Sequence, residues 1–301
     1  MKYHVTHTTT YTYDDSVSNS LGVAYLVPRP LPWQQVFSTL VTTVPVASDF
    51  SQDVDYYGNL VTYYQVTVPH TLLEITSVSD VEVDLPLYDG STFGQPWEGA
   101  RPLVHPELAG AWRASDVAVQ SQLAEHTDEA YRYGAQSLTP GRPLVEAVTE
   151  LMQRVHSDFA YDKTVTTVTS TVNHIFEARG GVCQDFAHLM LACLRSHGLA
   201  VRYVSGYLST VPPPGAERVV GADASHAWIA VWVPTPAGDA TAPAEGQWLA
   251  VDPTNNQWAN DRYVTVAWGR DYADVPPVKG VIFTDAKSSQ LSVSVDVAPV
   301  P

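Results

Sequence analysis

Residues 180–188 read Gly-Gly-Val-Cys-Gln-Asp-Phe-Ala-His and open the most regular helical pattern in this chain. From here, side chains recur at the i, i+3, i+4, i+7 spacing of one helix face: Phe186, Leu189, Met190, Cys193, Leu194 and His197. Gly198 stands where a helix-ending cap residue belongs. The spacing predicts a helix over residues 182–197 that follows two glycines and carries Cys183 in its first turn.

Cys183 has the surroundings that a nucleophilic cysteine requires. The N-terminus of a helix carries about half a positive charge, which favours thiolate over thiol. First-turn N–H groups have no partner within the helix, so one of them can bind an oxyanion. The glycines before Cys183 allow close approach of another backbone or of a substrate. Taken alone, Cys183 also fits a small buried hydrophobic residue.

Cys193 lies on the apolar stripe of the same predicted helix, and we interpret it as a core residue. The two Cα atoms would be about 15 Å apart along a helix that rises 1.5 Å per residue. A disulfide needs roughly 7 Å or less. We therefore expect two free cysteines, which fits a reducing compartment. The N-terminal residues lack the apolar core of an export signal, so we predict a cytoplasmic protein.

Three strands are predicted after this helix, over residues 200–209, 226–233 and 247–252. His226 begins the second strand and Asp252 ends the third. If these two strands form an antiparallel hairpin, the start of one lies beside the end of the other. Cross-strand neighbours have Cβ atoms about 5 Å apart, so the imidazole and the carboxylate can meet. The carboxylate would then fix the ring tautomer and favour imidazolium. Alone, each residue also fits an ordinary strand-end or turn position.

The N-terminal third has a different character. Residues 1–85 are rich in Thr, Val and Tyr with period-two patterning, which predicts short strands in an antiparallel β-domain. One such face contains Phe37, Thr39 and Val41. Residues 86–106 are rich in Pro and Gly and are predicted to form a linker.

Helices are predicted to follow the linker, the best of them over residues 142–156. Loops are predicted over residues 211–225 and 234–246, and two strand-like runs lie between residues 278 and 297. This order of elements predicts an α+β fold.

Three segments, in the order Cys, His, Asp, closely resemble the transglutaminase-like superfamily. They are residues 181–188, residues 224–228 (Ala-Ser-His-Ala-Trp) and residues 251–256 (Val-Asp-Pro-Thr-Asn-Asn). Residues 201–207 resemble the family's strand after the nucleophile helix. The N-terminal region, with the run Asp-Tyr-Tyr-Gly-Asn at residues 55–59, resembles the β-domain that precedes this core in bacterial members.

The resemblance implies a papain-like transglutaminase core, in which the nucleophile helix packs on an antiparallel sheet behind an antiparallel β-domain. It divides the chain into residues 1–105 (β-domain plus linker), residues 106–270 (catalytic core) and residues 271–301 (C-terminal strands packing on the body).

The resemblance also implies a cysteine protease or amidase with a catalytic triad of Cys183, His226 and Asp252. This triad would transfer the acyl group of a Gln side chain or a peptide bond through a thioester, with hydrolysis favoured over transamidation. Four further residues are expected near the substrate or in support of the triad: Asp185, His188, Tyr207 and Trp228. At about 100° per residue, Asp185 and His188 fall on the side of the helix away from the buried stripe.

The net charge of the chain excludes some classes of binding partner. The formal net charge is −16 and the pI about 4.8, which argues against nucleic acid and against an anionic membrane surface. No apolar run reaches the roughly 18 residues that span a bilayer. We predict a protein or peptide substrate and no cofactor or metal. A zinc site built from Cys183, His188, His226 and Asp252 is the weaker alternative, because no Cys-x-x-Cys or His-x-x-x-His pair is present.

Two other functions fit the same sequence. The chain could be a binding or scaffold module that keeps a relict transglutaminase-like site. The β-domain could also act as a docking surface that brings a partner protein to the site.

Overall fold

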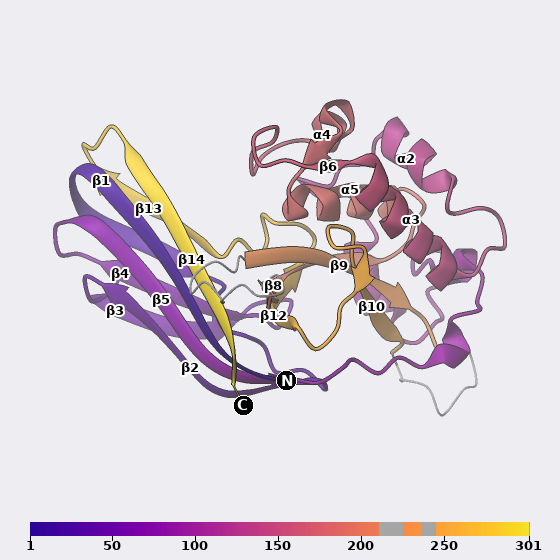
Figure 1. The fold of residues 1–301 in the computed structure, drawn as a ribbon, viewed down its shortest axis with the longest axis horizontal. Coiled ribbons are helices and arrows are strands. Elements are labelled where there is room, and N and C mark those ends of the chain that lie inside the picture. Colours follow the sequence, from indigo (N-terminus) through magenta and orange to yellow (C-terminus); the bar gives the residue numbers. More distant parts are fainter. Residues whose placement is uncertain (211–224, 236–244, 301) are drawn as a thin grey trace, which may run out of the picture.

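The computed structural model describes residues 1–210, 225–235 and 245–300, so the two predicted loops lie almost wholly outside the described residues. Two sheets organise the chain (Figure 1). A seven-stranded antiparallel sheet forms one end of the molecule, and a five-stranded sheet with helices packed on it forms the other. The predicted α+β fold is confirmed.

Strand β1 (Lys2–Ala24) runs for 23 residues through the middle of the first sheet. Along one edge it pairs with β5 (His70–Val83) and then β4 (Leu60–Val66). Along the other edge it pairs with β14 (Ser289–Val300) and then β13 (Val278–Thr284). The prediction of short strands is wrong for β1, because no Pro or Gly interrupts residues 2–21. The C-terminal strands are thus hydrogen-bonded members of the N-terminal sheet.

Strand β2 (Gln34–Val44) pairs with β5, and strand β3 (Asp49–Val54) pairs with β4. A register shift between Val36 and Ser38 inserts an extra residue into β2. Phe37 is therefore 53% exposed, although Val41 on the same strand is buried. The predicted common face of Phe37, Thr39 and Val41 is wrong for Phe37, because a bulge breaks the period of two.

The second sheet has the strand order β11-β10-β9-β8-β12. Its strands are β8 (Val201–Leu208), β9 (Ser225–Val233), β10 (Gln247–Asp252), β11 (Gln257–Trp258) and β12 (Tyr263–Gly269). The first three confirm the predicted ranges to within one residue. Helix α5 (Cys183–Arg195) confirms the predicted nucleophile helix and packs on β8 and β9.

Three helices surround α5, namely α2 (Asp128–Ala135), α3 (Leu144–Asp158) and α4 (Val172–Ala178). Helix α3 confirms the helix predicted near residues 142–156. The predicted linker contains only the short 3-10 helices η1 (Gly90–Thr92) and η2 (Trp97–Ala100). The remaining short elements are α1 (Ala111–Ala114), η3 (Ser115–Val117), β6 (Ala160–Tyr161) and β7 (Gly180–Gly181). None of the helices in the described residues is long and apolar enough to cross a membrane.

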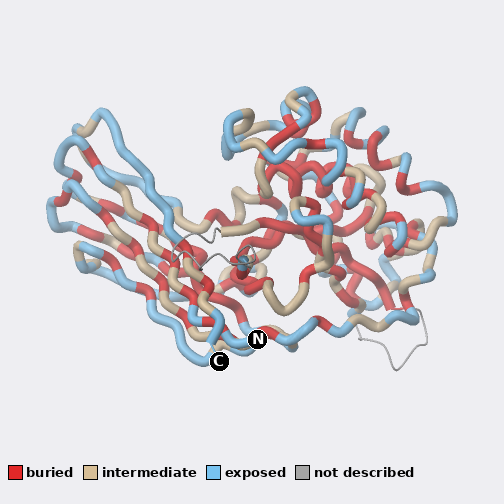
Figure 2. Tube along the Cα trace, viewed as in Figure 1, coloured by how far each residue is buried: buried red, intermediate tan, exposed pale blue. Residues whose placement is uncertain are grey.

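One hydrophobic core joins the two sheets. Tyr3 and Val5 of β1 and Val295 and Val297 of β14 belong to the same buried cluster as the apolar residues of α5. Burial of each such valine contributes about 1.5–3 kcal/mol, which holds the first sheet against the helix-covered core. Figure 2 shows buried residues concentrated around α5 and the second sheet, while the outer part of β14 is exposed. The N-terminal sheet is therefore fixed beside the end of α5 that carries Cys183.

Candidate active site

Cys183 is the first residue of α5, and the preceding turn is organised by Asp185. The Asp185 carboxylate accepts hydrogen bonds from the Val182 backbone N–H (2.7 Å) and from Thr166 Oγ1 (2.6 Å). A Cβ at Gly181 would lie only 2.6 Å from Asp185 Oδ2, so glycine is required there by close approach. Asp185 is 1% exposed. Its expected place on the open side of the helix is wrong, because the side chain folds back to cap the first turn.

His226 and Asp252 meet across the β9–β10 hairpin. His226 Nε2–H donates to Asp252 Oδ2 at 2.7 Å. The same carboxylate oxygen accepts from Asn255 Nδ2 and from Tyr263 Oη, each at 2.7 Å. The backbone N–H of Thr254 donates to the other oxygen at 2.8 Å. Asp252 is fully buried, so these donors replace the water that a carboxylate requires.

Charge on this pair is set by competing effects. Burial alone would lower the pKa of His226, but hydrogen bonds to Asp252 and Cys183 and their negative charges raise that pKa to about 10. Burial would raise the pKa of Asp252, yet the bonds and charge of His226, with Asn255 and Tyr263, lower it overall. The ring is therefore protonated and the carboxylate ionised at neutral pH. Because Nε2 is bound to Asp252, Nδ1 is the nitrogen left to interact with Cys183.

A cavity of about 250 Å³ opens onto Cys183 and His226. The core contributes Val168, Gln184, Tyr203 and Ser205 to its walls. The N-terminal sheet contributes five further side chains from its two ends of the sequence: His7, Thr9 and Tyr11 from β1, and Leu291 and Val293 from β14. These five side chains had no signal in the sequence, since they lie more than a hundred residues from Cys183 or at the opposite end of the chain. The site is thus built by both sheets.

None of the four residues expected near the substrate or in support of the triad lines this cavity: Asp185, His188, Tyr207 and Trp228. His188 is fully buried, accepts a hydrogen bond from the Tyr272 backbone N–H (3.2 Å) at Nε2, and has no partner for Nδ1 among the described residues. The Tyr207 hydroxyl is bonded to His7 Nδ1 at 3.1 Å, between the two sheets. Trp228 packs behind the histidine, with its ring centroid 6.0 Å from that of His226.

The prediction that His188 lies on the side of the helix away from the buried stripe is wrong, because β8 and the segment around Tyr272 cover that side of α5 as well. Burial lowers the pKa of His188 well below its ordinary value, and the nearby Asp271 only partly opposes this. A neutral ring packed in the core is the result.

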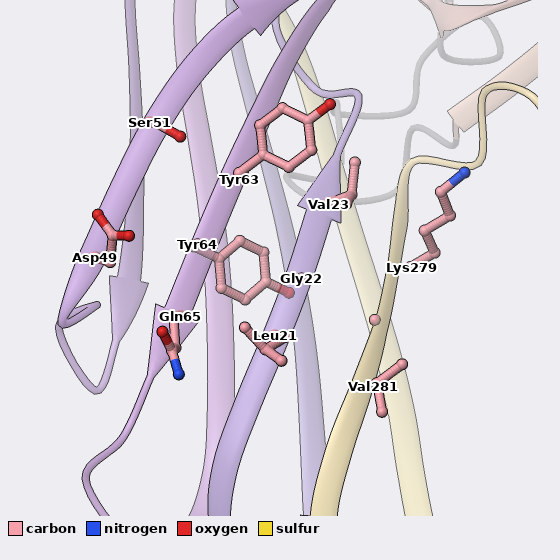
Figure 3. Close-up of a pocket in the computed structure, with 11 residues that line it drawn as sticks. Leu21, Gly22, Val23, Asp49, Ser51, Tyr63, Tyr64, Gln65, Lys279 and Val281 are labelled. Carbon is pink, nitrogen blue, oxygen red and sulfur yellow. The ribbon is translucent and has the colours of Figure 1, made fainter.

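A second, larger cavity of about 480 Å³ lies in the N-terminal sheet (Figure 3). The Tyr64 ring of β4 covers Gly22 of β1, where a Cβ would lie 2.0 Å from that ring. Asp49, Tyr63 and Lys279 surround this space. The described residues that line it include no cysteine or histidine, so the pair of Cys183 and His226 belongs to the smaller cavity. Among the described residues, no three His, Cys, Asp or Glu side chains are placed to hold a metal ion.

Comparisons with known proteins agree with this arrangement. The bacterial transglutaminase-like N-terminal region matches residues 3–82, and the transglutaminase-like superfamily matches residues 132–253. An uncharacterised protein of Mycobacterium bovis is 45% identical over 301 residues, which are 99% of this chain and 93% of the relative. An uncharacterised protein of Mycobacterium leprae is 32% identical over 299 residues, which are 98% of each chain.

More distant matches share the core. A protein-glutamine gamma-glutamyltransferase of Pseudomonas aeruginosa is 32% identical over 138 residues, 44% of this chain and 19% of that enzyme. The crystal structure of a candidate cysteine protease from Cytophaga hutchinsonii superposes with a TM-score of 0.71 at 14% identity, covering 99% of this chain and 97% of that chain. With both family regions in order and relatives over the whole length, the chain belongs to the transglutaminase-like superfamily.

Proposed function

We propose that this protein is a cysteine-nucleophile enzyme that transfers the acyl group of an amide through a thioester. The observation that carries the proposal is the hydrogen bond between His226 and Asp252, with the Cys183 sulfur and the His226 ring at one cavity. This arrangement fits the general requirement that a nucleophile lies next to a base, which is itself oriented by a third group. The substrate is a protein or peptide that presents a Gln side chain or a peptide bond.

In the first step, the ionised Cys183 sulfur attacks the amide carbonyl carbon. A C–S bond forms, and the carbonyl electron pair moves to oxygen. The backbone N–H of Cys183, in the first turn of α5 where N–H groups lack an intrahelical acceptor, stabilises that oxyanion. Protonated His226 gives its proton to the amide nitrogen, the C–N bond breaks, and ammonia or an amine leaves. Asp252 holds the ring in the orientation that allows this transfer.

In the second step, neutral His226 takes a proton from water while the water oxygen attacks the thioester. The C–S bond breaks, and the Cys183 thiolate and a carboxylic acid are released. An amine in place of water would give transamidation, the chemistry named for the Pseudomonas relative. We favour hydrolysis, since Cys183 is partly exposed at an open cavity where water competes at high concentration.

The test is activity on a library of Gln-containing peptides, with and without an added amine. Ammonia release and the mass change of each peptide are followed together. We expect release of ammonia or peptide cleavage without incorporation of the amine, and its loss by at least about 10³-fold in Cys183→Ala. Cys193→Ala is the matched control and should retain activity. Full activity of Cys183→Ala would rule the mechanism out, and turnover of no amide by the wild type would favour a relict binding module.

A cytoplasmic location is part of this proposal. Both cysteines are free in the structure, as expected for a protein in a reducing compartment. Fractionation of the producing cells, followed by immunodetection, would test it, and recovery outside the cytoplasm would contradict it.

A further inference from the structure

Strand β14 forms one margin of the N-terminal sheet, on the side that faces the helix-covered core (Figure 1). One of its edges pairs with β1 along its whole length. Within the described residues, the other edge of residues 289–294 has no backbone hydrogen-bond partner. In an antiparallel strand, every second residue directs both its N–H and its C=O to the outer edge. Residues 289–294 therefore present a row of free main-chain donors and acceptors.

Two other margins of this sheet, β2 and β3, carry features that discourage pairing with a further strand. Strand β2 contains the bulge near Phe37, and strand β3 carries Asp49 and Asp53 within six residues. Bulges and charges are the usual protection of an edge strand. The segment at residues 289–294 reads Ser-Gln-Leu-Ser-Val-Ser and has no charge and no Pro, and all six residues are exposed. Residues 280–284 of β13 also have no charge and no Pro and, among the described residues, pair only with β1, so residues 289–294 are one of two unprotected margins.

The edge of residues 289–294 leads to the candidate active site. Leu291 and Val293 line the same cavity as Cys183 and His226. Further along β14, Val295 and Val297 lie on the same face and are buried in the core. Strand β14 is thus anchored at one end, where it contacts β8, and lies open along the cavity at the other.

The cavity lining has a composition that suits a main chain rather than a charged ligand. The described residues that line it include no Asp, Glu, Lys or Arg. Its polar groups include hydroxyls, an amide and two histidines. Burial lowers the pKa of His7 to about 4, so the His7 ring is neutral at pH 7. A segment with uncharged side chains would meet the least desolvation cost here.

From these observations we propose that an extended polypeptide substrate adds as a strand to the free edge of β14 at residues 289–294, which delivers its amide to Cys183. The inference rests on the acyl-transfer function proposed above and names its substrate class: an extended, uncharged segment recognised through its backbone. Main-chain hydrogen bonds supply the affinity in such strand addition, and alternate side chains supply the selectivity. Leu291 and Val293 would contact every second side chain of the substrate.

The test uses binding, so that it does not depend on turnover. The probe is a fluorescein-labelled peptide of eight alternating Thr and Val residues with Gln at its centre, together with a series that carries one N-methylated amide each. Binding to Cys183→Ala protein is measured by fluorescence anisotropy. We expect N-methylation to raise Kd by about tenfold at every second position and to have little effect between them, since only alternate amides face the β14 edge.

Hydrogen exchange read by mass spectrometry locates the bound peptide. With saturating peptide, amides in Ser289–Ser294 should exchange at least about tenfold more slowly, while those in Asp49–Val54 of β3 should not change. Val293→Lys places a charge on the cavity side of the edge and should weaken binding by about tenfold or more. Val54→Lys makes the same change at an exposed position on β3 and is the matched control.

Equal sensitivity to N-methylation at all positions, no protection of residues 289–294, or no binding of any peptide would overturn the inference. Alkylation of Cys183 in the wild-type protein reports on the proposed function separately. Suppose that the wild type is alkylated at Cys183 and hydrolyses peptides, but that N-methylation has no alternating effect on binding. The proposed function would then stand, and the proposed strand addition to β14 would be wrong.

Discussion

The two ends of helix α5 carry the same amino acid in opposite surroundings. Cys183 opens the helix and is partly exposed at a cavity that it shares with His226. Cys193 lies near the other end, fully buried, and burial raises its pKa far above the ordinary value for a thiol. The difference teaches that the helix alone does not make a cysteine reactive. The first turn, the ring from β9 and the open cavity do so together.

Alkylation should separate the two cysteines by the largest margin. We expect iodoacetamide at pH 7 to modify Cys183 at least about 10³-fold faster than Cys193, because Cys193 is fully buried and must wait for local unfolding while Cys183 is accessible at the cavity. Peptide mass mapping after timed quenching measures both rates in one sample. In His226→Ala the rate at Cys183 should fall by about tenfold or more, while the rate at Cys193 should not change. Comparable rates at the two sulfurs in the folded wild type would break the comparison.

The sequence predicts those parts of this contrast that depend on residues close together in the chain. It does not predict contacts between residues far apart in the chain. The helix and the β9–β10 hairpin are encoded by local period, so the placements of Cys183, His226 and Asp252 on their elements were predictable. Tyr263 was missed because its bond to Asp252 depends on β12 joining the sheet beside β8. His7 and Leu291 were missed because they come from the two ends of the chain. Their place at the cavity depends on β14 pairing with β1, a contact that no local pattern encodes.

Asp252→Asn tests whether the buried carboxylate that is bonded to the His226 ring makes Cys183 more reactive than Cys193. Loss of that charge removes the main group that raises the pKa of His226, so the ring should lose its proton at lower pH. The alkaline limit of kcat/KM, near pH 10 in the wild type, should move down by about 1–3 pH units. At neutral pH, kcat/KM should fall by on the order of 10³-fold, because the ring also loses its orientation. A pH–rate profile of both proteins on one peptide measures both changes.

The pH dependence of the free energy of unfolding is an independent test of Asp252→Asn. The raised pKa of His226 stabilises the folded state fully below pH 6.5, and this contribution is lost as pH rises through about 10. The lowered pKa of Asp252 stabilises it above the ordinary carboxyl pKa, and this is lost as pH falls through the folded value. Urea unfolding across pH should therefore show both slopes flattened in Asp252→Asn. Unchanged slopes would mean that His226 and Asp252 are not a charged pair.

Tyr263→Phe should have a smaller effect, because it removes one of three donors to Asp252 Oδ2 and leaves His226 and Asn255 in place. We expect destabilisation by about 1 kcal/mol and a fall in kcat/KM of roughly tenfold or less. Tyr207→Phe is the matched control, since that hydroxyl is also buried and bonded but lies outside the cavity. It should lose similar stability in urea and keep kcat/KM. A large loss of activity in both variants would show that the effect is not specific to the carboxylate.

His188→Gln should change activity least. This variant tests whether the middle of α5 supports the reactive Cys183 or only packs in the core, as Cys193 does. His188 lies midway between the two cysteines, is fully buried, and is absent from the cavity wall. Gln retains an acceptor for the Tyr272 N–H, so kcat/KM should stay within about twofold of the wild type.

The pH dependence of stability should nevertheless change in His188→Gln. Burial lowers the pKa of His188 in the folded protein. As pH falls below 6.5, His188 therefore binds a proton in the unfolded chain but stays neutral in the folded chain. Stability conferred by a neutral His188 is thus lost toward acid, by about 2–3 kcal/mol by pH 4, and the variant should lack this part of the slope. Urea unfolding between pH 7 and pH 4 measures it. A variant with the wild-type slope but greatly reduced activity would place His188 with Cys183, and would show that the reactive end of the helix extends deeper than the cavity.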